Sequence, residues 1–163
     1  VQAKRLGSII LHGPPGTGKT TLARILAAET EGQFRSLSAV SASVKDVREV
    51  LAWAADETAA TGHRPVLFLD EIHRFNRSQQ DALLPDVEAG IITLIGATTS
   101  NPYFAINDAL LSRSQLFELH PLSSDDIATI LQSALKDPVR GLGNLRLKIT
   151  PEALSFLSDV VEG

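Results

Sequence analysis

The sequence predicts an α/β fold in which a parallel β-sheet is flanked by helices. Two observations indicate this fold. Over residues 1–121, short apolar runs alternate with amphipathic helical stretches, and this alternation is typical of a parallel sheet. The run at residues 66–69 is apolar without interruption, as expected for a central strand that helices cover on both sides.

Five segments are predicted to be the strands of the sheet. In chain order they are residues 8–12, 34–37, 65–69, 92–97 and 116–119. Each has the length and apolar content of a buried strand. Helical or loop sequence separates consecutive strands, so we expect the strands to be parallel and joined by crossover connections.

Helical segments are predicted at residues 18–30, 43–61 and 76–90. The second carries an apolar stripe, formed by Val44, Val47, Val50, Leu51, Ala54 and Ala55. Trp53 falls on the opposite face, where we expect it to pack against a loop or, alternatively, to stack on a DNA base or a partner. Asn76 and Gln79 have capping-box spacing at the start of the third helix. Pro85 predicts a kink or break near Leu84 because it lacks a backbone donor.

The character of the chain changes after residue 121. The acidic Ser-Ser-Asp-Asp segment at residues 123–126 opens a helix, a connector follows at residues 137–144, and Pro151 begins another helix. We therefore expect residues 1–121 to form an α/β nucleotide-binding core and residues 122–163 to begin a helical domain.

Composition narrows the class of protein. The chain has 163 residues, 44% hydrophobic and 21% charged, which is ordinary for a globular domain. It has no cysteine, no charged-then-apolar leader and no long apolar run, so we expect a cytoplasmic protein without disulfides or membrane contact. A net charge of -4 argues against coating nucleic acid by bulk electrostatics. Because it starts at Val1 rather than Met and ends within a helical pattern, we expect a fragment of a longer protein.

A phosphate-binding loop is predicted between the first strand and the first helix. Gly13, four residues and then Gly18-Lys19-Thr20 form the P-loop pattern in its required setting. Glycines let consecutive N–H groups turn toward phosphate oxygens, and Lys19 would contact the β and γ phosphates. Thr20 suits Mg²⁺, and Thr21 suits the α-phosphate. The predicted ATP-binding residues are Gly13, Pro14, Pro15, Gly16, Thr17, Gly18, Lys19, Thr20 and Thr21.

Two carboxylates end the third strand at the sheet edge where the P-loop is also expected. Asp70 would hold Mg²⁺ through its water shell, and Glu71 would activate the water that attacks the γ-phosphate. An acidic pair at a strand end is common on protein surfaces, so by itself it is weak evidence for a catalytic site. It becomes strong evidence only together with the P-loop. The adjacent glutamate and the lack of an NKxD-type guanine-reading motif favour ATP over GTP. His73 follows closely and would be able to orient this pair by a hydrogen bond.

The fourth strand leads into a polar segment at the same edge. Thr99 is the first candidate for a residue that senses the γ-phosphate, and Asn101 is the second. The alternative is that both only cap the turn from strand to loop. Arg113 follows a helical segment before the last strand, and it is expected to point outward.

These motifs together resemble the RarA/MgsA recombination factors, a group of AAA+ ATPases that includes the Werner-helicase-interacting ATPase. The resemblance rests on residues 11–27, 68–90, 95–113 and the connector at 140–141. It implies a five-stranded parallel sheet followed by a helical lid, with Walker A at residues 13–20, Walker B at residues 70–71 and sensor one at Thr99 or Asn101. Arg113 would be the finger that enters the site of a neighbouring subunit. The family's adenine-holding segment before the P-loop and its lid arginine are not in this sequence.

The resemblance also implies a function for the parent protein. It implies a homo-oligomeric ATPase stimulated by forked or gapped DNA or single-strand/duplex junctions, acting in replication-fork maintenance, recombination and repair. Contacts with single-strand-binding protein and replication machinery are implied too, as is association with the nucleoid in a bacterium. Two alternatives stay open, namely a RuvB-like branch-migration motor and a nucleotide-gated scaffold with little hydrolysis. Glu71 argues against the scaffold, since a pure switch needs no water-activating carboxylate.

Overall fold

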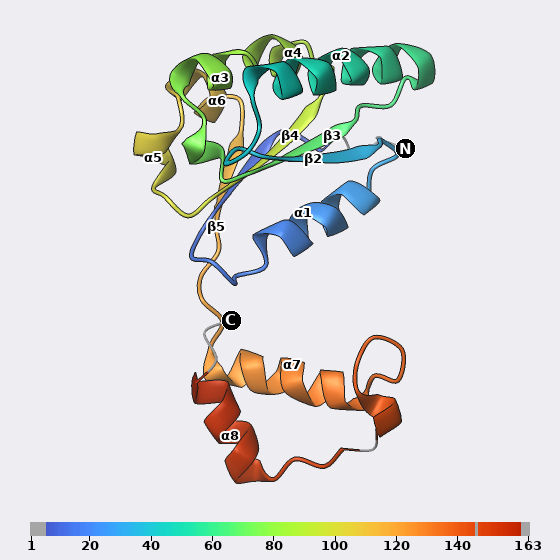
Figure 1. Ribbon diagram of the computed structural model, residues 1–163, viewed down its shortest axis with the longest axis vertical. Coiled ribbons are helices and arrows are strands. Elements are labelled where there is room, and N and C mark those ends of the chain that lie inside the picture. The colour runs from blue at the N-terminus through green and yellow to red at the C-terminus, as the bar shows by residue number, and fades with distance from the viewer. Residues whose placement is uncertain (1–5, 146, 161–163) are drawn as a thin grey trace. The chain divides into compact units, whose positions relative to one another are not determined.

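The computed structural model of the chain describes residues 6–145 and 147–160. Its elements follow one another as strands, helices and two short 3₁₀ turns (Figure 1). In chain order they are β1 (Ile9–His12), α1 (Lys19–Ala28), β2 (Phe34–Ser38), α2 (Val44–Thr61), β3 (Val66–Asp70), η1 (Ile72–Arg74), α3 (Arg77–Asp81), α4 (Leu84–Glu88), β4 (Thr93–Thr98), α5 (Pro102–Ala105), α6 (Asp108–Leu111), β5 (Gln115–Glu118), α7 (Ser124–Lys136), η2 (Gly143–Leu145) and α8 (Pro151–Val160).

The sheet has five strands in the order β2-β3-β4-β1-β5, and every neighbouring pair is parallel. All five predicted strands are therefore confirmed, each within one residue at either end. β1, β3 and β4 occupy the interior of the sheet, which explains why their sequences are apolar on both faces. β2 and β5 form the two edges.

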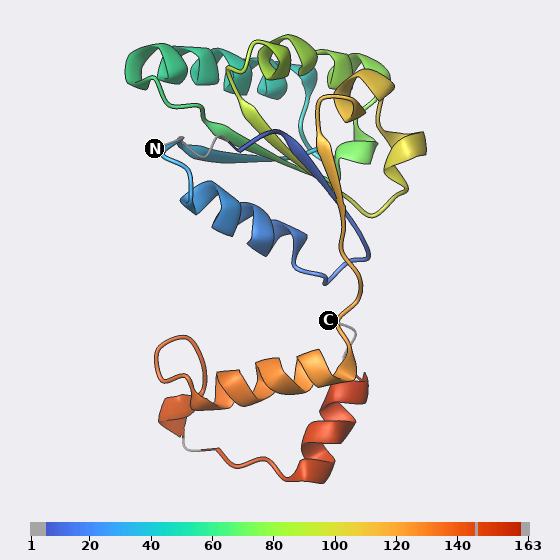
Figure 2. The ribbon, with the colours of Figure 1, turned by 180° about the vertical axis from the view of Figure 1, so that it is seen from behind.

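Helices cover both faces of the sheet, with α1 on one side and α2, α3 and α4 on the other (Figures 1 and 2). Two separate apolar cores fill these layers. Alternate residues of one strand serve both, because side chains on a strand point to opposite faces. On β3, Leu67 and Leu69 join the larger core, while Val66 and Phe68 join the core under α1.

Helix α2 begins with a capping box in which Ser43 and Asp46 each satisfy the other's backbone N–H. Most of the predicted stripe is buried, but Val44 in the first turn is 38% exposed and does not belong to the core. The placement of Trp53 on an outer face was wrong. Its ring packs against the larger core, and the guanidinium of Arg35 on β2 lies 3.8 Å from the ring centroid.

The predicted third helix is interrupted, as Pro85 indicates. Asn76 and Gln79 form the predicted capping box at the start of α3. That helix ends at Asp81, and α4 begins at Leu84 with Pro85 in its first turn, where a missing N–H costs no hydrogen bond. The break near Leu84 is therefore confirmed.

By its internal contacts the chain divides into two compact units, residues 1–14 with 18–119 and residues 15–17 with 120–163. The second unit contains α7, η2 and α8. We place the boundary of the helical domain between residues 121 and 122, as the sequence predicts, and this remains a proposal. The predicted helical pattern at the end of the chain, residues 161–163, lies outside the described residues. None of the described helices combines the length and apolarity that crossing a membrane requires.

Candidate functional site

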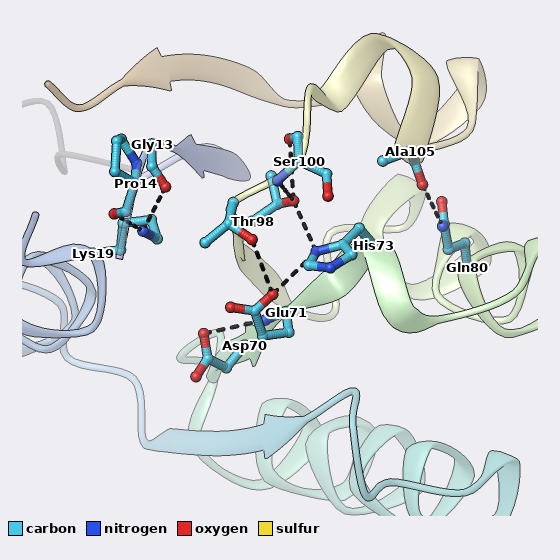
Figure 3. A network of polar contacts seen from close by, with 11 residues as sticks. Gly13, Pro14, Lys19, Asp70, Glu71, His73, Gln80, Thr98, Ser100 and Ala105 are labelled. Carbon is cyan, nitrogen blue, oxygen red and sulfur yellow. Dashed lines mark hydrogen bonds and ion pairs between the residues drawn. The ribbon is translucent and has the colours of Figure 1, made fainter. Parts of the chain in front are cut away.

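The site lies at the edge of the sheet where the carboxyl ends of β1, β3 and β4 meet. The parallel register pairs His12 with Thr98 and Leu69 with Gly96. The loop after β1, the acidic pair at the end of β3 and the polar segment after β4 therefore lie side by side (Figure 3). In open α/β sheets, this is the edge at which ligands bind.

The loop after β1 depends on glycine at two positions. Gly13 is buried, and a Cβ there would collide with the backbone oxygen of Leu119. Gly18 adopts φ 84°, a left-handed conformation that residues with a Cβ adopt at a cost. Helix α1 begins directly after it, so Thr20 and Thr21 stand exposed in its first turn. The predicted P-loop thus has a strand before it, a helix after it and no room for larger residues at Gly13.

Lys19 is folded back on this loop. Its side chain is largely buried, and Nζ donates hydrogen bonds to the oxygens of Gly13 at 2.8 Å and Pro14 at 2.6 Å (Figure 3). Burial lowers the pKa of Lys19, while the nearby charges of Glu71 and Asp70 act in the opposite direction. The lysine predicted to bind phosphate therefore lies within electrostatic reach of both predicted carboxylates.

Glu71 has an unusual backbone conformation for its residue type. Among the residues that the structure describes, it is the one non-glycine residue with positive φ, at φ 54° and ψ 42°. Its N–H donates to Asp70 Oδ1 at 3.1 Å. Such strain persists only where surrounding structure holds it, and it is frequent at functional sites. Here it turns the chain from β3 directly into η1.

The carboxylate of Glu71 is in contact with two side chains that follow it in the sequence. Glu71 Oε2 lies 3.2 Å from His73 Nδ1 and 3.4 Å from Thr99 Oγ1, which donates to it. His73 Nδ1 also lies 3.0 Å from Thr98 Oγ1. The contact between His73 and the acidic pair, considered from sequence, is therefore present, whereas Thr98 was not singled out. Its signal in the sequence was a hydroxyl at the end of a largely apolar strand.

The two sensor candidates differ in their surroundings. Thr99 is exposed and reaches Glu71, so it lies within the site. The Asn101 side chain accepts a hydrogen bond from Tyr103 N at 3.0 Å and caps α5, which is the alternative role considered for it. The geometry supports Thr99 as the sensor, and the assignment stays a prediction.

Arg113 follows α6 and lies at the surface, as expected. It forms an ion pair with Glu88 at the end of α4 and donates to the backbone oxygen of Ala109. About two fifths of its side chain is exposed, 41% by area. The structure thus places Arg113 on its own chain's surface, and its role toward a neighbouring subunit stays a prediction.

The donor set fits magnesium held mainly by nucleotide. Within the described residues, no group of three or more His, Cys, Asp and Glu side chains forms a metal site. The candidates are Asp70 and the hydroxyl of Thr20, which are hard oxygen ligands. Mg²⁺ commonly takes one or two such protein ligands, with phosphate and water completing its shell.

Gln80 is a buried residue that sequence reasoning missed. Its Nε2 donates to the backbone oxygens of Phe75 and Ala105, both at 3.0 Å, and its Oε1 accepts from Asn107 N at 2.8 Å. One side chain thereby connects the segment after η1 with α5 and with the N-terminus of α6. Figure 3 shows its contact with Ala105. No sequence motif marks this residue, because two of its partners, Ala105 and Asn107, lie 25 and 27 residues further along the chain.

We expect Gln80→Leu to destabilise the chain by roughly 2–3 kcal/mol, because leucine leaves Phe75 O, Ala105 O and Asn107 N without their partner. Denaturant unfolding monitored by circular dichroism measures this change. Gln33→Leu is the matched control, since Gln33 makes its side-chain hydrogen bond on the surface and its loss should change stability by less than about 0.5 kcal/mol. Equal stability of the two variants would contradict the structural role of Gln80.

The sequence matches a known family over most of its length. The profile described as "ATPase family associated with various cellular activities (AAA)" covers residues 9–122. Replication-associated recombination protein A of Escherichia coli K12 is 46% identical over 100% of this chain, which spans 36% of that protein. ATPase WRNIP1 of Dictyostelium discoideum is 45% identical over 99% of this chain and 18% of its own length. The predicted resemblance to the RarA recombination factors is confirmed.

Solved structures show the same fold. The Thermotoga maritima RuvB Holliday junction branch migration motor aligns with a TM-score of 0.70 at 28% identity. The alignment covers 93% of this chain and 48% of RuvB. The chain thus spans about a third of the recombination protein and about half of the branch-migration motor.

Proposed function

The chain belongs to the AAA family of ATPases, and on this basis we propose that it is the ATP-binding and ATP-hydrolysing core of a DNA-dependent AAA+ ATPase. The observation that carries this proposal is that Lys19 lies at the same sheet edge as Asp70 and Glu71, close enough for its charge to interact with both carboxylates. A cation for the phosphates beside two carboxylates, one for metal and one for water, is the minimum that phosphoryl transfer to water requires.

Each residue of the site has a proposed role. Backbone N–H groups of the loop at residues 13–18 and the N-terminus of α1 would bind the phosphates, and Lys19 would contact the β and γ phosphates. Thr21 would bind the α-phosphate. Thr20 and Asp70 would hold Mg²⁺, which supplies charge neutralisation on the phosphate oxygens. Glu71 would accept a proton from the attacking water.

Thr99 and Arg113 extend this proposal beyond the phosphate loop. Thr99 would report the presence of the γ-phosphate to Glu71, because its hydroxyl already contacts that carboxylate. Arg113 would enter the site of the next subunit in a homo-oligomer and stabilise charge in the transition state. In the isolated chain it is paired with Glu88, so this role requires exchange of that ion pair for a neighbour's nucleotide.

The biological role is proposed from the relatives. Similarity to replication-associated recombination proteins and to a branch-migration motor supports DNA as the partner that stimulates hydrolysis, at forks, gaps or single-strand/duplex junctions. We propose replication-fork maintenance, recombination and repair as the setting, with the replication machinery and single-strand-binding protein nearby. We propose the cytoplasm as the compartment of the parent protein, with association with the nucleoid in a bacterium. A RuvB-like motor is the second candidate, and the shared fold and 28% identity favour its consideration.

The proposed function predicts that the full-length protein hydrolyses ATP and that forked or gapped DNA raises its turnover. The physical reason is that DNA binding favours the assembled ring, in which a neighbour's Arg113 completes the site. Steady-state ATPase measurements with and without forked, gapped and blunt duplex DNA check this. Absence of turnover under every condition would leave only a nucleotide-gated scaffold.

Strand displacement assays separate the two candidate functions. A fork-maintenance ATPase should hydrolyse ATP without processive movement through a four-way junction, whereas a branch-migration motor should resolve a labelled junction in an ATP-dependent manner.

Arg113→Ala in the same assays tests whether a neighbouring subunit contributes to the site. Unchanged turnover in that variant would contradict the proposed finger.

A further inference from the structure

We propose that His73 is a positioning residue, which holds the carboxylate of Glu71 in place for hydrolysis through a hydrogen bond that Thr98 orients. The inference rests on the proposed function, because it assigns a role within the same reaction. Three elements meet in this contact, namely the end of β3, η1 and the end of β4 (Figure 3). His73 Nδ1 lies 3.2 Å from Glu71 Oε2 and 3.0 Å from Thr98 Oγ1.

The chemistry of the contacts fixes the position of one proton. A carboxylate oxygen can only accept a hydrogen bond, so His73 Nδ1, at 3.2 Å from Glu71 Oε2, must carry hydrogen for the two to attract. The opposite tautomer would place a nitrogen lone pair against the carboxylate. The imidazole therefore acts as a donor toward Glu71, which pins the orientation of both groups.

Thr98 completes this arrangement without conflict. Its hydroxyl lies 3.2 Å from Ser100 O, to which it donates, and it accepts from Ser100 N at 3.0 Å. Because Thr98 donates its single hydroxyl hydrogen to Ser100 O, its Oγ1 can accept from His73 Nδ1–H at 3.0 Å, as a second acceptor beside Glu71 Oε2. Among the described residues no buried side-chain polar atom lacks a partner, and this assignment satisfies every group in the cluster.

Thr98, the anchor of this contact, belongs to the buried interior of the sheet. Thr98 is fully buried at the end of β4, which pairs with β1 on one side and β3 on the other. The side chain of His73 is 13% exposed, and that of Glu71 is 30% exposed. Side-chain exposure therefore rises from Thr98 through His73 to Glu71, so the imidazole connects the exposed carboxylate to a buried residue of the sheet. A general base must be held within about 3 Å of its water, so this constraint serves hydrolysis.

A second histidine–glutamate pair provides a comparison. His63 Nδ1 lies 3.0 Å from Glu31 Oε2, but their side chains are 48% and 82% exposed. His63 precedes β3, whereas Glu71 directly follows it, so the two histidine–glutamate pairs lie at opposite ends of that strand. His63 is therefore a matched control, because the same substitution removes the same type of contact at a distant surface position.

The experiment uses the full-length protein and the variants His73→Leu, His73→Asn and His63→Leu. We expect His73→Leu to lower kcat for ATP by about 10- to 100-fold, as the loss of one hydrogen bond to a charged group predicts, with little change in KM. His73→Asn should restore most of this loss, since its amide nitrogen is attached to Cγ as Nδ1 is. His63→Leu should behave as wild type.

One further comparison separates positioning from a general structural effect. In single-turnover measurements with excess enzyme, His73→Leu should cause no further loss when Glu71 is already replaced by glutamine, because the two act as one unit. If thermal melting shows that His73→Leu does not fold, His73→Gln replaces it. The glutamine amide is attached one carbon further along the side chain than Nδ1 is, so His73→Gln should lose kcat as His73→Leu would.

Each remaining outcome overturns the inference. Unchanged kcat in all His73 variants, failure of His73→Asn to restore the rate, or a loss that persists in the Glu71→Gln background would exclude positioning through Glu71. These results would leave the proposed ATPase intact, since wild-type turnover would still be present. Wild-type turnover no greater than that of Glu71→Gln would instead overturn the proposed function and this inference together.

Discussion

Glu71→Gln is expected to lower kcat for ATP hydrolysis by about 100- to 10,000-fold, the range that a general base contributes, while ATP binding is retained. Glutamine has nearly the same shape as glutamate, so the left-handed turn at φ 54° and the neighbouring Asp70 should keep their positions. The side chain can still meet His73, but it can no longer take a proton from water. Steady-state turnover together with titration of a fluorescent ATP analogue measures both effects.

Glu49→Gln is the control for this substitution. Glu49 makes an exposed ion pair with Lys45 on α2, which contributes little to stability and lies outside the sheet edge that carries Lys19 and Glu71. Its turnover should equal that of wild type. If Glu71→Gln hydrolysed ATP at the wild-type rate, the water-activating group would have to be another residue.

Lys19→Met is expected to weaken ATP binding by about 10- to 100-fold, because it removes a charge-assisted hydrogen bond to phosphate. Methionine keeps most of the length and burial of the side chain. Lys19 Nζ also donates to the backbone oxygens of Gly13 and Pro14, so the variant also loses contacts that shape the loop. Isothermal titration calorimetry with a non-hydrolysable ATP analogue measures the change in Kd.

Lys45→Met removes a lysine of the same length from an exposed surface, and its Kd should equal that of wild type. A Lys19→Met variant that binds the ATP analogue as tightly as wild type would contradict the phosphate-binding role. Nucleotide would then have to bind away from the loop that follows β1.

Local sequence signals predicted the fold well because each signal acts over a few residues. Asn76 with Gln79 marked the start of α3, and Pro85 marked the break before α4. Trp53 escaped this reasoning. Its helical phase placed it away from the main stripe, but Arg35 and the core surround it through contacts that are distant in sequence.

The candidate site was predicted to a similar extent. The P-loop spacing and the Asp70–Glu71 pair located the candidate site, because each motif is contiguous, and the phosphate and metal roles that residue type suggests for them stay predictions. Thr98 and Gln80 were missed. Their side chains act through partners 25 residues away in the sequence, on His73 and on Ala105 respectively.

The sequence by itself determined the order of strands and helices, the glycines of the phosphate loop and the residue types available for ATP chemistry. These follow from periodicity, backbone conformation and side-chain functional groups, which are local properties. Only the tertiary structure decided that Thr98 contacts His73, that Thr99 reaches Glu71, and that Arg113 pairs with Glu88. Strand order and crossover packing set those distances, and they depend on the burial of the whole sheet rather than on any single segment.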